Sequence, residues 1–119
     1  MNIYDITPLG KPRMTRADKW KTRPAVIRYR EFCDEARLRK IHLPESGAHI
    51  TFVMPMPPSW IKKKREQFNG KPHQSKPDCD NMLKALMDAL FDDDSSVWDC
   101  CITKLWGEKG QIIIRENAQ

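Results

Sequence analysis

Apolar residues in the first half of the chain follow the spacing of one strand, one helix and a second strand. Ile3 and Ile6 are the apolar anchors of a first strand over residues 2–7. Pro24 suits the first turn of a helix. Apolar residues then recur near helical spacing: Val26, Ile27, Tyr29, Phe32, Cys33, Ala36 and Leu38. The pattern predicts a helix over residues 24–40, followed by a strand over residues 49–54 (HITFVM) that prolines end.

The second half of the chain predicts one strongly amphipathic helix and two strands. The helix covers residues 81–91 and has Asp78 or Asp80 as its cap. Its apolar stripe consists of Leu83, Leu86, Met87 and Leu90. A strand over residues 97–105, with Trp98, Cys100 and Ile102 on one face, is predicted to pair as a hairpin with a strand over residues 111–115. A turn at residues 107–110 joins them.

These elements predict an α+β fold in which a small mixed sheet of about four strands packs with two main helices. At 119 residues, the chain has the size of one domain, spanning residues 1–119. Two long polar stretches interrupt the pattern, at residues 8–23 and 59–77. The second is too long for a simple connector, so we expect it to be functional, with a short helix over residues 60–67 as an alternative.

Composition narrows the class of protein. No apolar run reaches the roughly 18 residues of a membrane span, and the N-terminus lacks the apolar core of a signal peptide, so we expect a cytoplasmic protein without a membrane partner. The four cysteines have neither zinc-finger nor disulfide spacing and are expected to be reduced. The net charge is +5, with basic residues gathered in residues 11–30 and 62–76 and aspartates in residues 78–99. This distribution fits a polyanion-binding enzyme whose active centre needs cations.

The candidate chemistry lies in the acidic segment. Asp78 and Asp80 are two residues apart in backbone expected to be extended, which places both carboxylates on one side. Asp80, Lys84 and Asp88 line one helix face, and the run Asp92-Asp93-Asp94 follows the helix. Two carboxylates about 4 Å apart repel by on the order of 4 kcal/mol at an effective dielectric of about 20. If they converge, either one carboxylate takes a proton or a divalent cation neutralises the pair. Mg²⁺, or Mn²⁺ as a substitute, would form a phosphodiester hydrolysis site there.

Structural interpretations of the same residues stay open. Asp78 or Asp80 can be a helix cap, and the residues spaced by four can form a surface ion-pair ladder. The three consecutive aspartates can form a solvated turn. Whether Asp94 reaches the other two carboxylates cannot be derived from the helix pattern, because the helix separates them by roughly 16 Å.

The acidic segment reads KPDCDNMLKALMDAL and is followed by the acidic turn DDSSVWD. This pattern resembles the RusA family of Holliday junction resolvases, which is common in bacteriophages and prophages. The stretch GKPRMTR near the N-terminus and the passage PPSWIKKKREQFNGKPH also look like the family's. The resemblance covers nearly the whole chain.

The resemblance implies a homodimer that binds four-way DNA junctions and makes paired, symmetric nicks with Mg²⁺. The family's metal-binding aspartates match Asp78, Asp80 and Asp94, with Asp93 as a substitute for Asp94, and its essential lysine matches Lys84. Asp88 is expected to support the site. The expected phosphate contacts are Lys62, Lys63, Lys64, Arg65, Arg13, Arg16 and Lys76. Trp60 and Phe68 are expected to pack under their loop rather than stack on a base.

Two other functions remain as alternatives. One is a non-catalytic DNA-binding or regulatory protein that would bind DNA equally well in EDTA. The other is a metal-dependent nuclease acting on other DNA or RNA structures. The PD-(D/E)xK nuclease class is disfavoured, since no acid-x-Lys motif follows on the next strand. Lys104 on that strand is interpreted as a surface residue, with a position near the site as the alternative.

Overall fold

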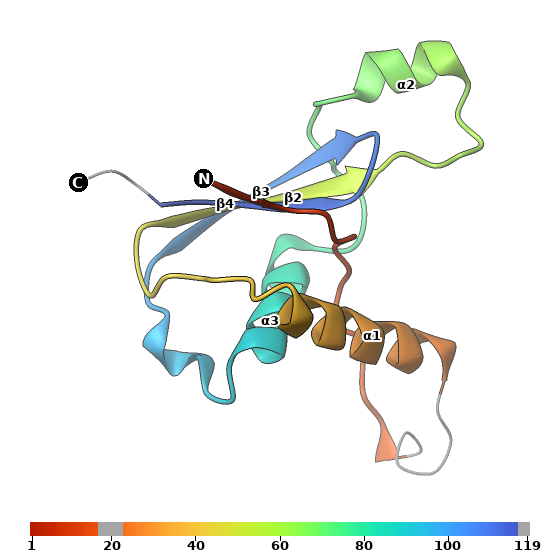
Figure 1. Ribbon diagram of the computed structural model, residues 1–119. Helices are drawn as coiled ribbons and strands as arrows, with labels where there is room; N and C mark the ends of the chain where they lie inside the picture. Colours follow the sequence, from red (N-terminus) through yellow and green to blue (C-terminus); the bar gives the residue numbers. More distant parts are fainter. Residues whose placement is uncertain (17–22, 117–119) are drawn as a thin grey trace.

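The structure, a computed structural model, describes residues 1–16 and 23–116. Within these residues it has one four-stranded mixed sheet and three α-helices, which confirms the predicted α+β class (Figure 1). In chain order the elements are β1 (Asn2–Tyr4), α1 (Pro24–Leu38), β2 (Ala48–Pro55), α2 (Lys62–Phe68), α3 (Cys79–Leu90), the 3-10 turn η2 (Asp94–Ser96), β3 (Cys100–Gly107) and β4 (Gln111–Glu116).

The sheet order is β1-β4-β2-β3, which overturns the predicted hairpin of the last two strands. β2 lies between them, parallel to β3 and antiparallel to β4. The turn after Gly107 therefore crosses the end of β2, where the backbone N–H of Met56 donates to the Gly107 carbonyl at 3.0 Å. A β3–β4 hairpin would leave the most apolar strand at an edge, whereas this order satisfies the backbone of β2 on both sides.

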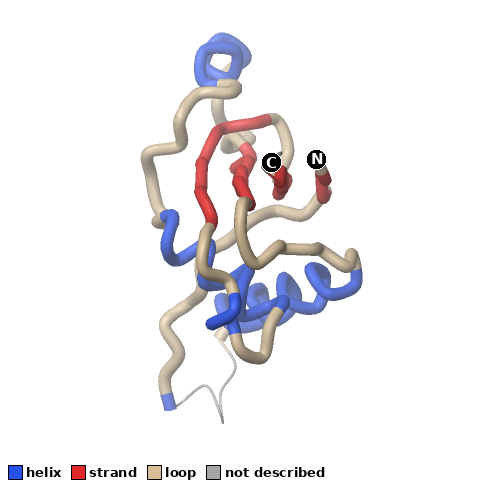
Figure 2. The backbone as a smooth tube through the Cα atoms, turned by 90° about the vertical axis from the view of Figure 1, so that its left-hand side faces the viewer, coloured by secondary structure: helices blue, strands red, loops and turns tan. Residues whose placement is uncertain are grey.

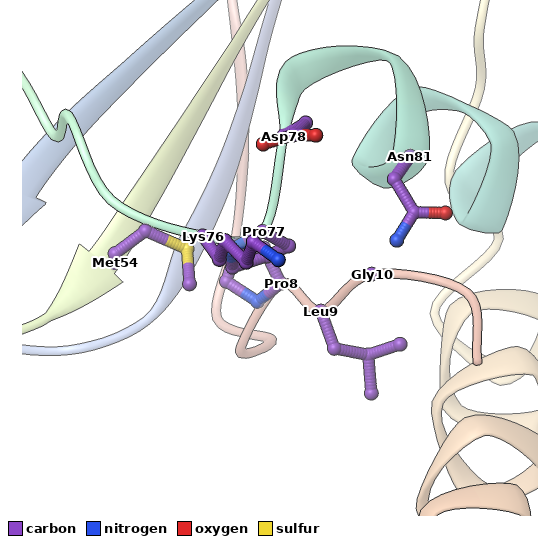
Figure 3. A pocket seen from close by; sticks show the side chains of 8 residues that line it. All are labelled: Pro8, Leu9, Gly10, Met54, Lys76, Pro77, Asp78 and Asn81. Atoms are coloured by element: carbon purple, nitrogen blue, oxygen red, sulfur yellow. The ribbon is translucent and has the colours of Figure 1, made fainter. Parts of the chain in front are cut away.

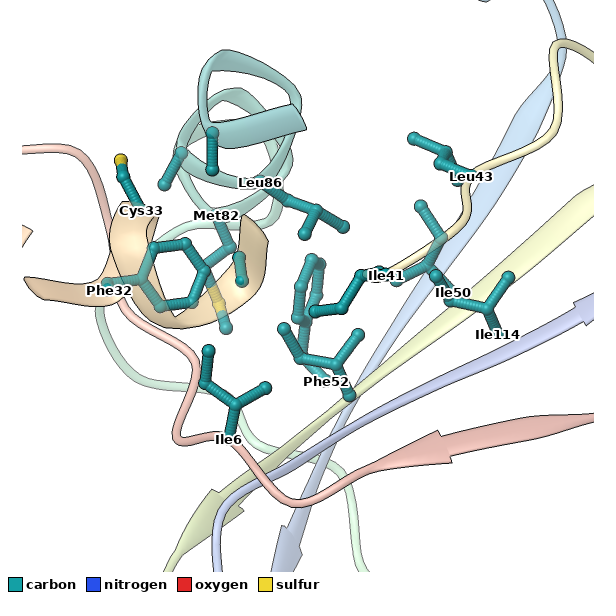
Figure 4. Close-up of a cluster of buried hydrophobic side chains, with 14 of the residues drawn as sticks. Ile6, Phe32, Cys33, Ile41, Leu43, Ile50, Phe52, Met82, Leu86 and Ile114 are labelled. Carbon is teal, nitrogen blue, oxygen red and sulfur yellow. The ribbon is translucent and has the colours of Figure 1, made fainter. Parts of the chain in front are cut away.

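The helices are distributed unequally around the sheet. α1 and α3 lie on one side of it, and α2 projects on the opposite side beyond the strand ends, as two perpendicular views show (Figures 1 and 2). The core fills the space between the sheet and the helix pair (Figure 4). Phe52 and Ile50 of β2 meet Leu86 and Met82 of α3 there, and all four are at most 1 % exposed. This packing fixes α3, and with it the acidic segment, against the sheet.

Several predicted apolar anchors lie outside this core. Ile3 is 53 % exposed because β1 turns it toward the face without helices, whereas Ile6 is buried. Trp98 is 76 % exposed, since β3 begins only at Cys100. Ile27 and Leu38 of α1 also face solvent.

The apolar stripe predicted on α3 is displaced by about one residue. The residues buried there are Met82, Ala85, Leu86 and Ala89, so only Leu86 of the predicted stripe is fully buried. The small alanines let the helix approach α1 closely, which a stripe count based on large side chains misses. No helix in the described part of the chain combines the length and apolarity that membrane crossing needs.

Candidate active site

The acidic segment begins where the chain enters α3. Asp78 occupies the N-cap position, with extended backbone, but its side chain makes no capping hydrogen bond. The interpretation of Asp78 as a helix cap therefore fails for its side chain. Asp80 lies in the first turn of α3 and is exposed. Across the described residues, neither carboxylate has a hydrogen-bonded or ion-pair partner, so both are free to bind a cation.

The loop before Asp78 is fixed by a lysine from the sheet. Lys104 of β3 donates from Nζ to the carbonyl of Ser75 at 2.8 Å and to that of Pro77 at 2.7 Å. The Lys76–Pro77 peptide bond between them is cis. Lys104 is thus an internal brace of the loop that ends at Asp78, and its interpretation as a surface lysine was wrong.

A second set of contacts ties the N-terminal loop to α3. The Lys11 ammonium lies 2.6 Å from Asp88 Oδ2, and the Lys84 ammonium lies 3.9 Å from the other carboxylate oxygen. Asp88 therefore sits between two lysines, in the supporting role that the sequence suggested. Lys84 remains 58 % exposed, which leaves its ammonium accessible to a phosphate.

The acidic turn distinguishes its aspartates. Asp93 Oδ1 accepts from the Ser95 backbone N–H at 3.0 Å and caps η2. This bond, together with a side-chain hydrogen bond from Ser95, lowers the pKa of Asp93 below its ordinary value. Asp94 begins η2, and nothing among the described residues pairs with its carboxylate. The turn interpretation thus applies to Asp93, and Asp94 remains the better candidate ligand.

The three candidate aspartates are not gathered into one cluster. Throughout residues 1–16 and 23–116, no group of three or more acidic, histidine or cysteine side chains is placed to hold a metal ion. Asp78 precedes α3 and Asp94 follows it, so the full length of the helix lies between their backbones. A single chain in this arrangement offers Asp78 and Asp80 at one end and Asp94 at the other.

An open pocket of about 520 Å³ adjoins Asp78. Three segments form it: the N-terminal loop at residues 8–10, Met54 of β2, and the stretch from Lys76 to the first turn of α3 (Figure 3). Gly10 is essential to its shape. A Cβ there would lie 2.5 Å from Asn81 Nδ2 and 2.8 Å from Pro77 Cβ, so only glycine allows this close approach.

The basic candidates on α2 divide into two kinds. Lys62 and Lys63 are exposed, and within the described residues no contact fixes their side chains. Arg65 instead donates to the Pro57 carbonyl at 2.9 Å and to Glu108 at 3.1 Å, and Lys64 lies 4.2 Å from the Trp60 ring centroid. Arg65 therefore anchors the helix through these bonds, whereas its expected role as a phosphate contact stays a prediction.

The aromatic residues at the two ends of α2, Trp60 and Phe68, pack against other rings as expected. The Trp60 ring lies 5.2 Å from Phe68 and 4.9 Å from Trp106, which itself contacts His73 at 4.3 Å between ring centroids. His73 is 5 % exposed, and no group within residues 1–16 and 23–116 forms a hydrogen bond with its Nδ1. Burial, and secondarily the Lys104 charge, lowers the pKa of His73. The cluster secures α2 to the sheet.

The remaining basic candidates are exposed side chains outside α2. Arg13 and Arg16 are exposed on the N-terminal loop, and Lys76 is exposed at the rim of the pocket. Residues 17–22 of the predicted basic loop lie outside the described residues. Lys76 thus offers an accessible cation beside the pocket, and Arg13 and Arg16 offer two more on the N-terminal loop.

A scan against protein families finds one that accounts for this combination. The model of the family described as endodeoxyribonuclease RusA matches residues 4–115. The chain belongs to the RusA family. A search of curated proteins finds no match. RusA membership makes the chain an endonuclease of the Holliday-junction class, acting on branched DNA, and favours the nuclease interpretation over a non-catalytic DNA-binding protein.

The sequence pointed to the candidate residues of the RusA site itself but not to the residues that hold them in position. Lys104, Lys11 and Gly10 act through contacts with segments distant in the sequence. Lys11 and Gly10 do fall in the stretch GKPRMTR that resembled the family, which was the available signal. Lys104 was considered near the site only as the weaker alternative, because a lysine on an edge strand looks like surface.

Proposed function

We propose that this RusA-family chain is a Mg²⁺-dependent endonuclease that resolves four-way DNA junctions by paired, symmetric cuts as a homodimer. The observation that carries the proposal is the state of Asp78, which occupies a helix N-cap without capping it. Ordinary selection for helix stability would use that carboxylate, since a side-chain cap typically contributes about 1 kcal/mol. Its freedom beside the equally free Asp80 points to a ligand.

The donors fit the ion. Mg²⁺ prefers oxygen ligands and is commonly held by one or two carboxylates together with waters and substrate phosphates. Asp78 and Asp80 supply such carboxylates. Asp94 lies at the other end of α3, so it is the proposed third ligand only as a contribution from a second copy of the chain, and Asp93 is used by its turn. When bound, the ion would polarise the scissile phosphate and activate a water.

The chain's own residues have separate tasks. Lys84, accessible and positioned by Asp88, stabilises the negative charge that grows on the phosphate oxygens. Lys104 holds the loop ahead of Asp78, and Lys11 ties the N-terminal loop to α3. Lys62 and Lys63 contact phosphates of a junction arm, which positions the DNA but reads little sequence.

The homodimer follows from the substrate. An unfolded four-way junction has approximate twofold symmetry, and a C2 dimer would present two equivalent sites to it. Light scattering coupled to size-exclusion chromatography would measure the oligomeric state with and without junction DNA. A stable monomer that remains monomeric on the junction would contradict paired cutting.

The deciding experiment uses a synthetic four-way junction and a linear duplex of the same sequence, each with Mg²⁺ or with EDTA. We expect nicked duplex products only from the junction and only with Mg²⁺. The variant Asp80→Asn should lose cleavage and keep junction binding. Cleavage in EDTA would remove the metal from the proposal, and cutting of other branched or RNA substrates in preference to the junction would favour the alternative nuclease.

A further inference from the structure

The pocket beside Asp78 has a chemistry that metal binding does not explain. Its lining combines apolar and polar groups: Pro8, Leu9, Met54 and Pro77 supply apolar surface, and the polar side chains are Lys76, Asp78 and Asn81, of which Asp78 and Asn81 lie toward α3 (Figure 3). A phosphate would gain nothing from the apolar walls. A flat ring with a polar edge matches them, since apolar surface favours its faces and an amide side chain offers both a donor and an acceptor to its edge.

The pocket is built into the fold on both sides. Lys104 fixes the wall that contains Pro77 through two carbonyl contacts, of 2.8 and 2.7 Å. Lys11 fixes the opposite wall, with its backbone N–H 3.5 Å from the Asn81 carbonyl and its ammonium bound to Asp88. Gly10 permits the two walls to meet. A volume of about 520 Å³ is within the range of small-ligand pockets, roughly 300–1,000 Å³.

We propose that this pocket receives one nucleobase of the cleaved strand, adjacent to the scissile phosphate. The inference rests on the proposed function in one respect, namely that Asp78 marks where the phosphate is cut. Lys76 at the rim supplies a cation where the backbone of the same nucleotide would enter. A nucleotide has this combination of a flat polar-edged ring and an attached anion.

The proposal explains why a branched substrate would be preferred. A base can enter the pocket only after leaving its stack, which costs a few kcal/mol in duplex DNA and less where pairing or stacking is already interrupted. The exchange point of a four-way junction is such a place. The pocket would therefore contribute selectivity for branched DNA independently of the number of phosphate contacts.

The test first locates the base and then blocks the pocket. Junctions carrying 2-aminopurine at successive positions around the exchange point are bound to wild-type protein in EDTA. We expect a several-fold rise in fluorescence at one position and its loss in Met54→Trp, which fills the pocket. Leu38→Trp adds the same side chain at a position 77 % exposed on α1 and serves as the matched control.

An abasic nucleotide at the same position provides the second arm. Met54→Trp should cleave the intact junction slowly and the abasic junction at the wild-type rate, because no base then needs room. Asn81→Leu, which keeps the volume and removes the amide, should weaken discrimination between bases at that position by about 5- to 150-fold, the equivalent of 1–3 kcal/mol per base contact.

The outcomes separate this inference from the proposed function. No fluorescence rise at any position, or an equal rise in Met54→Trp, overturns the base pocket even if the junction is resolved. Failure of the abasic junction to rescue Met54→Trp also overturns it. Absence of cleavage by wild-type protein would refute the proposed function, whereas the fluorescence arm in EDTA would still report on the pocket.

Discussion

Replacing Lys104 with methionine tests the arrangement of the site most directly. The change keeps the length of the side chain and removes the ammonium that binds the carbonyls of Ser75 and Pro77. Hydrogen bonds with a charged donor contribute about 1.5–3 kcal/mol each. The bond to Ser75 is exposed, so its contribution is set at or below the lower end of this range, and the part-buried bond to Pro77 contributes the rest. Together the two bonds then contribute about 3 kcal/mol. That energy corresponds to a roughly 150-fold change in the population of the braced loop.

The loss should appear in turnover and not in binding. Asp78 directly follows the braced carbonyl of Pro77, and a displacement of about 1 Å at a reacting centre can cost on the order of 10²-fold in rate. We therefore expect single-turnover cleavage of a four-way junction by Lys104→Met to fall by roughly that factor. Junction affinity in EDTA should stay near the wild-type value, since the exposed lysines of α2 are unchanged.

A control variant and a second measurement test this prediction further. Lys109→Met removes an exposed lysine paired with Asp5 at 3.3 Å, and exposed surface pairs contribute little to stability, so cleavage should be unaffected. In Lys104→Met the pKa of His73 should rise, because the Lys104 charge is the second cause, behind burial, that lowers this pKa in the wild-type protein. NMR titration of His73 would measure the rise. Wild-type cleavage by Lys104→Met, with His73 shifted as expected, would refute the bracing argument.

The other predictions concern charge and titration. Lys84→Ala should reduce single-turnover cleavage by about two orders of magnitude, the scale for a group that stabilises transition-state charge, and wild-type turnover would exclude that role. Lys62→Ala and Lys63→Ala should each reduce the slope of log affinity against log salt by about 1, whereas Arg65→Ala should lower thermal stability and leave that slope unchanged; equal slopes in all three variants would contradict the division of α2. Because the pKa of His73 is lowered below 6.5, the unfolded chain binds more protons below that pH, so the free energy of unfolding should fall as pH decreases from about 6.5. His73→Phe should flatten this decline in urea titrations between pH 5 and 7, and an unchanged profile would assign it to other groups.

Local patterns predicted the elements better than their pairing. The helix from Pro24 and the helix after Asp78 both formed as expected, since proline at the first turn and a strong apolar stripe act within a few residues. The hairpin failed because strand partners depend on which strand must be buried on both sides, a property of the whole sheet. The alanines of α3 were overlooked for the same reason, as their burial depends on the approach of α1.

The candidate site divides in the same way. Asp78 and Asp80 are close in the chain, but the extended backbone expected through both does not hold, because α3 begins at Cys79 and places Asp80 in its first turn. The expectation that an alternating backbone puts both carboxylates on one side therefore loses its basis. Lys104 reaches its carbonyls across 27 and 29 positions of sequence, and no pattern at that range reveals such a contact. Asp93 and Asp94 could be told apart only when the bond from Ser95 showed which carboxylate the turn uses.

The position of Asp94 bears on how the proposed metal site is completed. A helix of 12 residues is about 18 Å long, and Asp78 precedes its first residue while Asp94 follows its last. No group of three suitable side chains converges in the described part of one chain. Completion must then use ligands beyond this arrangement, such as water and the substrate phosphate, or a second copy of the chain. If a second copy contributes, Mg²⁺ affinity should weaken on dilution of the protein in step with dissociation of the dimer; if substrate contributes, it should strengthen when junction DNA is added. Isothermal titration of Mg²⁺ into the protein at several protein concentrations, with and without a four-way junction made of uncleavable strands, distinguishes these routes.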